Sequence, residues 1–96
     1  TMEDLHISER GKAIDDVMNG FFDSTGKIPC QIDGGLKCFG HPIGASGLRM
    51  VYEIYLQLHG RADKRQLKNP DIGLTQNLGG FPMMNVISVA IVGRYT

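Results

Sequence analysis

The sequence predicts a layered α/β fold, and three observations carry that prediction. Residues 45–59 are apolar nearly all round a helix, as in helices buried on more than one side. Residues 72–78 are predicted to form one strand, and residues 84–92 form an almost continuously apolar second strand, typical of strands covered on both faces. A two-stranded sheet is marginal alone. The 96 residues are therefore expected to be part of a larger layered protein, or to assemble tightly with copies of themselves.

The chain is expected to begin with a helix over residues 1–22. Ser8 is a plausible N-cap, and Glu9 lies in the first turn after it. Apolar residues then recur at helical spacing, namely Ile14, Val17, Met18 and Phe21.

The middle of the chain is expected to change from loop to helix. Residues 23–43 contain two prolines and several glycines, and they predict a loop with at most a short extended piece at residues 28–32. The helix of residues 45–59 follows, and Ser46 can help to cap it. Residues 60–70 then form a charged connection that a proline closes.

A glycine pair in residues 79–82 is expected to join the two strands. It is interpreted either as a hairpin turn or as a strand-end turn whose backbone N–H groups face a reacting carbonyl, and spacing alone does not decide. Asn77, which precedes it, could donate a side-chain hydrogen bond there or simply support the turn.

Composition limits the class of protein. The net charge is zero, so there is no electrostatic reason to expect nucleic acid or an anionic membrane as partner. No apolar run is long enough to span a bilayer, and no signal-peptide pattern opens the chain. Two cysteines, Cys30 and Cys38, are too few for a disulfide scaffold, so a cytoplasmic location is expected. The chain opens Thr1-Met2, which favours a piece of a longer protein.

A glycine-rich loop around one histidine is the part of the sequence most informative about chemistry. Five glycines surround His41 in residues 34–47, and an apolar helix begins directly after it. Glycine lets the backbone turn tightly and lets a substrate approach closely. A histidine presented there can act as a general base or donate a hydrogen bond to a developing oxyanion. The alternative is a histidine packed in a tight turn before Pro42, but the surrounding glycines favour catalysis.

Other polar residues near the loop are weaker candidates. Cys38 could form an activated thiolate with His41, but three residues of loop do not constrain their geometry. Cys30 has less support, and these three residues lack a fourth ligand at a familiar metal-site spacing. A basic segment could hold phosphates, although the interleaved Asp63 favours a solvated loop; its members are Arg61, Lys64, Arg65 and Lys68.

The glycine-rich loop resembles a family motif. Residues 34–47, Gly-Gly-Leu-Lys-Cys-Phe-Gly-His-Pro-Ile-Gly-Ala-Ser-Gly, are similar to the active-site histidine motif of thiolases. The helix after it, the Asn77-Leu78-Gly79-Gly80 turn and the closing strand match the thiolase C-terminus in order and spacing. The likeness is greatest to archaeal thiolases and to the sterol-carrier-protein type. It implies that residues 1–96 are a C-terminal fragment of a thiolase C-terminal domain, within a layered αβαβα fold that is usually a dimer or tetramer.

The resemblance implies an activity and roles for three residues. The full-length protein would be an acetyl-CoA C-acetyltransferase-like acyltransferase, which cleaves 3-ketoacyl-CoA by thiolysis or condenses two acyl-CoA molecules, with acyl-CoA as substrate and no cofactor. His41 would help to deprotonate a nucleophilic cysteine and to stabilise the thioester oxyanion. Gly79 would donate its backbone N–H in a second oxyanion hole. Asn77 stands where many thiolases carry an acid/base cysteine, and it fits the variant in which that cysteine comes from an upstream His-Asp-Cys-Phe motif.

Two departures from the family pattern bear on activity. The family's nucleophilic cysteine belongs to its N-terminal half and the His-Asp-Cys-Phe segment would lie before Thr1, so neither is in these 96 residues. Gln31-Ile32-Asp33 replaces the usual Asn-Pro-Ser before the paired glycines, which leaves the shape of that loop open. The 96-residue chain alone is therefore expected to be inactive.

A second hypothesis is a non-catalytic thiolase-like subunit or scaffold in a complex that handles acyl-CoA. By the resemblance, archaeal thiolases are expected to work with a synthase and a small acyl-CoA-binding protein. The rest of the thiolase chain, or further copies of this one, is an expected partner under either hypothesis. A full-length protein without a nucleophilic cysteine would favour the scaffold.

Overall fold

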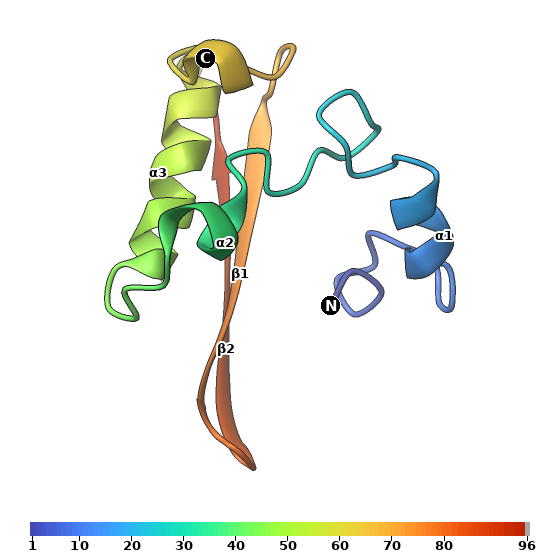
Figure 1. Ribbon diagram of the computed structural model, residues 1–96, viewed down its shortest axis with the longest axis vertical. Helices are drawn as coiled ribbons and strands as arrows, with labels where there is room; N and C mark the ends of the chain where they lie inside the picture. Colours follow the sequence, from blue (N-terminus) through green and yellow to red (C-terminus); the bar gives the residue numbers. More distant parts are fainter. Residues whose placement is uncertain (96) are drawn as a thin grey trace. The chain divides into compact units, whose positions relative to one another are not determined.

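The computed structural model describes residues 1–95, which form two compact units. Unit 1 is Thr1–Ile32, and unit 2 begins at Asp33 (Figure 1). The chain is mixed α/β, and no helix in the described residues is long and apolar enough to cross a membrane. The elements in order are α1 (Ala13–Met18), α2 (Gly35–Phe39), α3 (Ser46–Leu58), a 3₁₀ turn η1 (Asp63–Arg65), β1 (Ile72–Phe81) and β2 (Met84–Gly93).

Unit 1 contains much less helix than the sequence predicts. Only α1 is helical, and the residues before it form turns. His6 and Gly11 have left-handed backbone, with φ of 56° and 79°, so a right-handed helix cannot run through them. Ser8 is not a cap, because its buried hydroxyl has no hydrogen-bond partner among the described residues. The prediction of a helix over residues 1–22 is therefore wrong outside α1.

After α1 the chain folds back on itself as a loop. The backbone N–H groups of Ile28 and Cys30 donate to the carbonyls of Phe21 and Phe22, each at 3.0 Å. The two phenylalanine rings meet edge to face, with centroids 5.0 Å apart. These contacts close the loop, but residues 28–32 do not form a regular strand.

In unit 2, β1 and β2 form a long antiparallel hairpin. The register pairs Ile72 with Gly93 at the open end and Phe81 with Met84 at the turn. Successive side chains on a strand point to opposite faces, so the register also divides the hairpin into two faces. Figure 1 shows the turn end of the hairpin projecting beyond the helices of unit 2.

The turn of the hairpin lies later in the chain than predicted. Its two residues are Pro82, whose ring fixes φ, and Met83, which has a φ of 67°. Gly79 and Gly80 lie within β1 instead. A Cβ on Gly80 would come within 2.5 Å of the Met84 carbonyl oxygen, so glycine is required there for the close approach of β2. The glycine pair serves strand pairing, and its predicted place in the turn is wrong.

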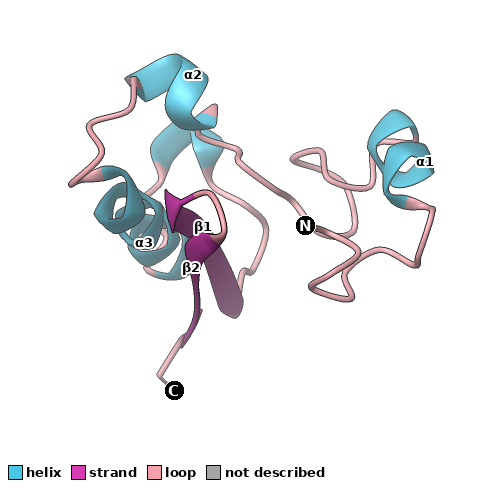
Figure 2. Cartoon of the chain, turned by 90° about the horizontal axis from the view of Figure 1, so that it is seen from below, coloured by secondary structure: helices cyan, strands magenta, loops and turns pink. Residues whose placement is uncertain are grey.

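Helix α3 packs against β1 along the open end of the hairpin (Figures 1 and 2). Ile54 covers Gly73 so closely that a Cβ on Gly73 would lie 2.5 Å from an Ile54 methyl carbon. Towards the other end of the helix, the side chain of Asn77 lies beside Gly47. The bounds of α3 agree with the helix predicted over residues 45–59, and β1 presents to it the face that carries Gly73 and Asn77.

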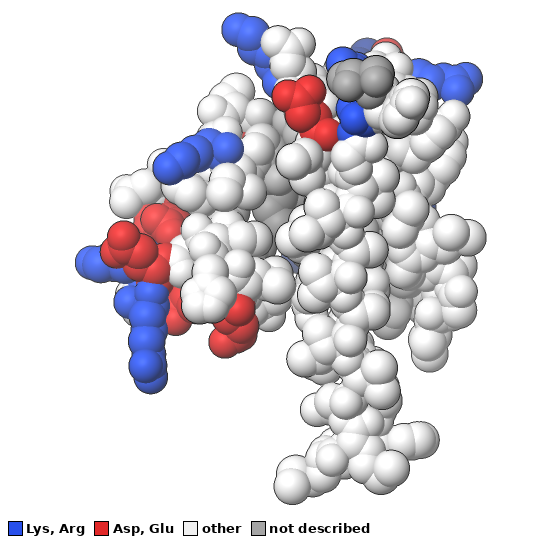
Figure 3. All heavy atoms as spheres, turned by 180° about the vertical axis from the view of Figure 1, so that it is seen from behind, with Lys and Arg blue, Asp and Glu red and all other residues white. Residues whose placement is uncertain are grey.

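The opposite face of the hairpin is apolar, and the described residues of unit 2 leave it uncovered. Residues 72–93 contain no Asp, Glu, Lys or Arg, and the projecting end of the hairpin shows no charged side chain in Figure 3. The register places six exposed apolar side chains on this face, those of Ile72, Leu74, Leu78, Ile87, Val89 and Ile91. An exposed apolar surface of this kind is typical of one that another protein surface covers.

Candidate active site

The predicted site lies on the segment between α2 and α3. Gly40, with a φ of 75°, turns the chain out of α2. The carbonyl of Pro42 accepts hydrogen bonds from the N–H groups of Ala45 at 2.8 Å and Ser46 at 3.0 Å, which begins the next helix. His41 is exposed between these two turns, immediately before the first turn of α3.

The side chain of Ser46 holds the His41 ring. His41 Nδ1 lies 2.7 Å from Ser46 Oγ, and the same hydroxyl donates to the Pro42 carbonyl at 3.2 Å. Ser46 is 8% exposed, so its hydroxyl is largely shielded from water. It does not cap α3 as predicted, because Ala45 occupies the N-cap position and Ser46 is the first helical residue. The hydroxyl anchors the histidine ring through Nδ1 instead.

The loop before His41 is fastened to α3 by Asp33 and Arg49. Asp33 Oδ1 accepts a hydrogen bond from the N–H of Gly35 at 3.0 Å, and Oδ2 lies 3.6 Å from the Arg49 guanidinium. That guanidinium stacks 4.0 Å from the centroid of the Phe39 ring. Asp33 stands where the thiolase pattern of the sequence analysis has serine. Like a serine, it holds the turn with a short polar side chain that accepts a backbone N–H. Sequence reasoning missed Arg49 and Phe39; the available signal was an arginine within an apolar helix.

Strand β1 brings Asn77 to the first turn of α3. A Cβ on Gly47 would lie 3.6 Å from both the amide oxygen and the amide nitrogen of Asn77. Gly47 directly follows Ser46, the residue that anchors His41. The structure therefore places two of the three predicted site residues, His41 and Asn77, at the same end of one helix.

Gly79 lies two residues beyond Asn77 on the same face of β1. It pairs with Val86 in the sheet, and a Cβ built on it meets no atom within 4 Å. Gly79 is exposed and stands outside the contact between Asn77 and Gly47. Gly79 thus lies exposed in a paired strand rather than in the predicted turn.

The two cysteines have different surroundings. Cys38 is exposed in α2 and its Sγ lies against Gly34, where an added Cβ would collide with it. Burial raises the pKa of the Cys30 thiol, which reduces its thiolate fraction and makes it a poor nucleophile at neutral pH. No group of three or more His, Cys, Asp or Glu in residues 1–95 is arranged to hold a metal ion.

A polar network fixes the segment that follows α3. The Arg65 guanidinium donates to both carboxylate oxygens of Glu53, at 2.9 and 3.2 Å. Gln57, which is 6% exposed, donates to Glu53 at 3.1 Å and to the Arg65 carbonyl at 2.8 Å, and it accepts the N–H of Leu67 at 2.8 Å. Arg65 of the basic segment therefore serves the fold.

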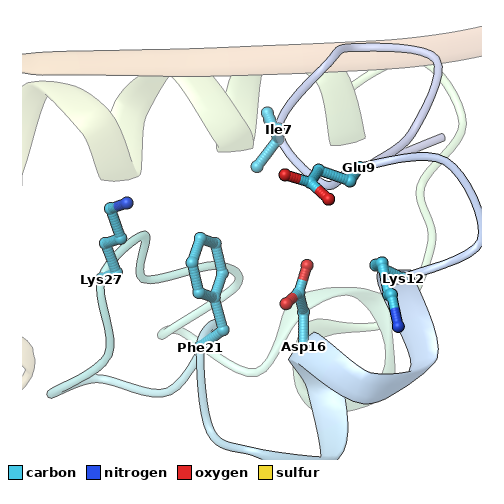
Figure 4. A pocket seen from close by; sticks show the side chains of 6 residues that line it. All are labelled: Ile7, Glu9, Lys12, Asp16, Phe21 and Lys27. Carbon is cyan, nitrogen blue, oxygen red and sulfur yellow. The ribbon is translucent and has the colours of Figure 1, made fainter.

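Unit 1 contains a hollow of about 360 Å³, lined by Ile7, Glu9, Lys12, Asp16, Phe21 and Lys27 (Figure 4). Lys27 Nζ lies 5.8 Å from the centroid of the Phe21 ring. The carboxylates of Glu9 and Asp16 face the hollow, while Lys12 Nζ turns towards Asp15 at 3.4 Å. Neither a thiol nor a histidine is among the residues that line this hollow.

Residues 1–94 match the family described as Thiolase C-terminal domain-like. The chain belongs to this family. The match includes the motif of residues 34–47, and it confirms the thiolase resemblance predicted from that motif.

Comparison with individual proteins supports the same family assignment. The acetyl-CoA acetyltransferase of Methanothermobacter thermautotrophicus is 42% identical over 79 residues, which cover 82% of this chain and 21% of the relative. The acetyl-CoA acetyltransferase of Methanocaldococcus jannaschii is 38% identical over 87 residues, with the same two shares. Human sterol carrier protein 2 is 38% identical over 79 residues, which cover 82% of this chain and 14% of the relative. The chain thus spans only 14% to 21% of the length of these relatives. No solved structure matches it.

Glu53 gives this thiolase-family domain a dependence on pH. Burial alone would raise the pKa of Glu53, but hydrogen bonds from Arg65 and Gln57, with the charges of Arg65 and Arg49, lower it below its ordinary value. A carboxylate with a lowered pKa stabilises the fold above its ordinary pKa, and this contribution is lost as the pH falls through the folded-state pKa. Glu53→Gln is therefore expected to lower resistance to urea at neutral pH, by an amount that shrinks in acid.

The measurement is urea unfolding followed by circular dichroism, at neutral pH and below the ordinary range of carboxyl groups. Asp63→Asn is the matched control, because Asp63 is exposed and asparagine tolerates its left-handed φ of 53°. A Glu53→Gln defect of the same size at both pH values would contradict the stabilisation by the ionised carboxylate.

Proposed function

We propose that this chain forms one wall of the thioester site in an acyl-CoA acyltransferase of the thiolase type. The proposal is supported by family membership and by relatives that are named acetyl-CoA acetyltransferases. The observation that carries it is the exposed His41 side chain, whose ring is held through Nδ1 by Ser46 on a glycine-rich loop. The substrates are a 3-ketoacyl-CoA and CoA, or two acyl-CoA molecules in the reverse direction.

In this mechanism His41 takes the proton from a cysteine thiol that lies outside residues 1–96. The thiolate attacks the 3-keto carbon, and cleavage of the C2–C3 bond leaves an acyl-enzyme thioester. The electron pair of that bond passes to the enolate of the departing acyl-CoA, which takes a proton from a second acid outside these residues. The thiolate of CoA then attacks the thioester and releases the enzyme's cysteine.

Charge develops on a carbonyl oxygen in both attacks. Protonated His41 donates a hydrogen bond to the thioester oxyanion, and the backbone N–H of Gly79 donates in a second oxyanion hole. Asn77 supports this wall from the face of β1 that meets Gly47. Cys38 and Cys30 play no nucleophilic part, since Cys38 lies against Gly34 and the raised pKa of Cys30 disfavours its thiolate.

The uncovered face of the hairpin supports a place within a larger assembly. Its uncharged, exposed apolar side chains match the need of a layered αβαβα thiolase fold for a further layer over this sheet. The rest of the thiolase chain supplies that layer, and pairing of complete subunits gives a dimer or tetramer. Two unpaired thiols are compatible with a cytoplasmic location.

The test is an assay of acetoacetyl-CoA cleavage in the presence of CoA by the full-length protein that contains these residues. The proposal expects turnover by the full-length protein and none by the 96-residue chain assayed in parallel. Cleavage by the 96-residue chain that His41→Ala abolishes would contradict the external nucleophile. A folded full-length protein without turnover would favour the scaffold, which acts beside a synthase and a small acyl-CoA-binding protein.

A further inference from the structure

We propose that Ser46 is a positioning residue that fixes the tautomer of His41. Its hydroxyl accepts a hydrogen bond from Nδ1–H, so the neutral imidazole keeps its lone pair on Nε2, the ring nitrogen that Ser46 does not contact. The catalytic consequence rests on the proposed function, but the tautomer itself does not depend on any activity.

The Ser46 hydroxyl has a single hydrogen to share between two neighbours. Ser46 Oγ carries one hydrogen and has two polar neighbours within hydrogen-bond distance, His41 Nδ1 at 2.7 Å and the Pro42 carbonyl oxygen at 3.2 Å. A carbonyl oxygen only accepts, so a hydrogen bond to Pro42 must use the Ser46 hydrogen. In that arrangement the hydroxyl has a lone pair left for Nδ1–H, and both short contacts are hydrogen bonds.

The opposite arrangement is less favourable. If the Ser46 hydrogen pointed to an unprotonated Nδ1, two lone-pair-bearing oxygens, Ser46 Oγ and the Pro42 carbonyl, would face each other 3.2 Å apart with no hydrogen between them. Ser46 is 8% exposed, which leaves little room for water to relieve that contact. The continuous chain from Nδ1–H through the hydroxyl to the carbonyl is cooperative and satisfies every group.

The position of Ser46 at the start of α3 makes this chain possible. A serine hydroxyl on a helix reaches the carbonyl four residues earlier, and here that carbonyl belongs to Pro42, the neighbour of His41. Alanine would remove both bonds. Threonine keeps a hydroxyl that can bond the same carbonyl, so Ser46→Thr is the conservative variant.

The consequence for chemistry follows from the two ring nitrogens. A general base needs its lone pair on the side that meets the substrate, and the hydrogen bond at the other nitrogen decides which tautomer is present. With Nδ1–H directed at Ser46, Nε2 can take a thiol proton without a prior tautomer change. A free histidine side chain in water favours the Nε2–H form, which would present a donor there instead.

The experiment records long-range ¹H–¹⁵N correlation spectra of the full-length protein labelled with ¹⁵N-histidine, at a pH where the imidazole is neutral. His41→Asn assigns the His41 signals by their loss. His59 is the internal reference, because its Nδ1 lies 2.9 Å from the Tyr55 carbonyl, which only accepts, and so must carry a hydrogen. We expect the Nδ1–H pattern for His41 in the wild type and Ser46→Thr, and its loss in Ser46→Ala with His59 unchanged.

Kinetics give a second measurement. Ser46→Ala is expected to lower kcat for thiolysis by at least about tenfold with little change in KM, and Ser46→Thr to restore it. A wild-type His41 with the Nε2–H pattern, or Ser46→Ala that retains Nδ1–H, would overturn the inference whatever the activity. A protein with the expected tautomer but no thiolysis would contradict the proposed function and leave the role of Ser46 in place.

Discussion

Replacing His41 with alanine in the full-length protein is expected to lower kcat for acetoacetyl-CoA thiolysis by about 10²–10⁴-fold, the usual contribution of a positioned acid–base group. Without the imidazole, the nucleophilic thiol has no acceptor for its proton and the thioester oxyanion loses a donor. The measurement is the initial rate at saturating acetoacetyl-CoA and CoA, followed by loss of the enolate absorbance of acetoacetyl-CoA.

His59→Ala is the matched control for this variant. His59 is the other histidine of unit 2, exposed at the opposite end of α3, where its ring meets Tyr55. Its replacement is expected to leave kcat unchanged. A His41→Ala protein that retains wild-type kcat would show that the exposed imidazole takes no part in proton transfer.

Replacing Gln57 with alanine is expected to destabilise unit 2 by about 2–4 kcal/mol. The side-chain amide pairs with the Arg65 carbonyl and the Leu67 N–H, and each unpaired buried group costs about 1–3 kcal/mol. This is a large share of the stability of a small domain. The measurement is the urea unfolding midpoint together with the denaturant slope, which separates lost stability from a change in the unfolded state.

Lys64→Ala is the control for the Gln57→Ala variant, because Lys64 is exposed in the same segment and its side chain forms no hydrogen bond with the described residues. Its effect is expected to stay within about 0.5 kcal/mol. A similarly small effect of Gln57→Ala would mean that water replaces the amide and that the network does not hold the segment after α3.

The sequence predicted the helix of residues 45–59 well and the helix of residues 1–22 poorly, for a physical reason. The apolar residues of α3 include Ile54, which packs on β1, so periodicity and tertiary contact agree there. Residues 1–22 also show helical spacing, but His6 and Gly11 have a left-handed backbone and only the short α1 forms, with Ile14 78% exposed. Periodicity alone does not stabilise a helix without a partner face.

The hairpin shows how turn signals compete. Two glycines before Phe81 predicted a turn, yet the turn consists of Pro82 and Met83. There the proline ring pre-sets φ and Met83 takes a positive φ. The glycine pair lies within β1 instead, where the absence of a side chain at Gly80 allows the neighbouring strand to approach closely. Sequence spacing does not distinguish these two uses of glycine.

The sequence predicted the central residue of the candidate site, His41, but not the side chains that hold its loop in place. The motif of residues 34–47 singled out His41, because glycine clustering and a helix start are local features. The anchors depend on side-chain geometry: the Ser46 hydroxyl reaches back to Nδ1, and Asp33 reaches forward to Arg49. The approach of Asn77 to Gly47 depends on strand packing, which spacing does not contain.

The residue that becomes acylated distinguishes an external nucleophilic cysteine from Cys30 and Cys38. Incubation of the full-length protein with acetyl-CoA, followed by intact-mass analysis and peptide mapping, measures both the rate and the place of acetylation. We expect one acetyl group on a cysteine outside residues 1–96, added much more slowly in His41→Ala. Acetylation at Cys30 or Cys38, or a rate that does not depend on His41, would contradict it.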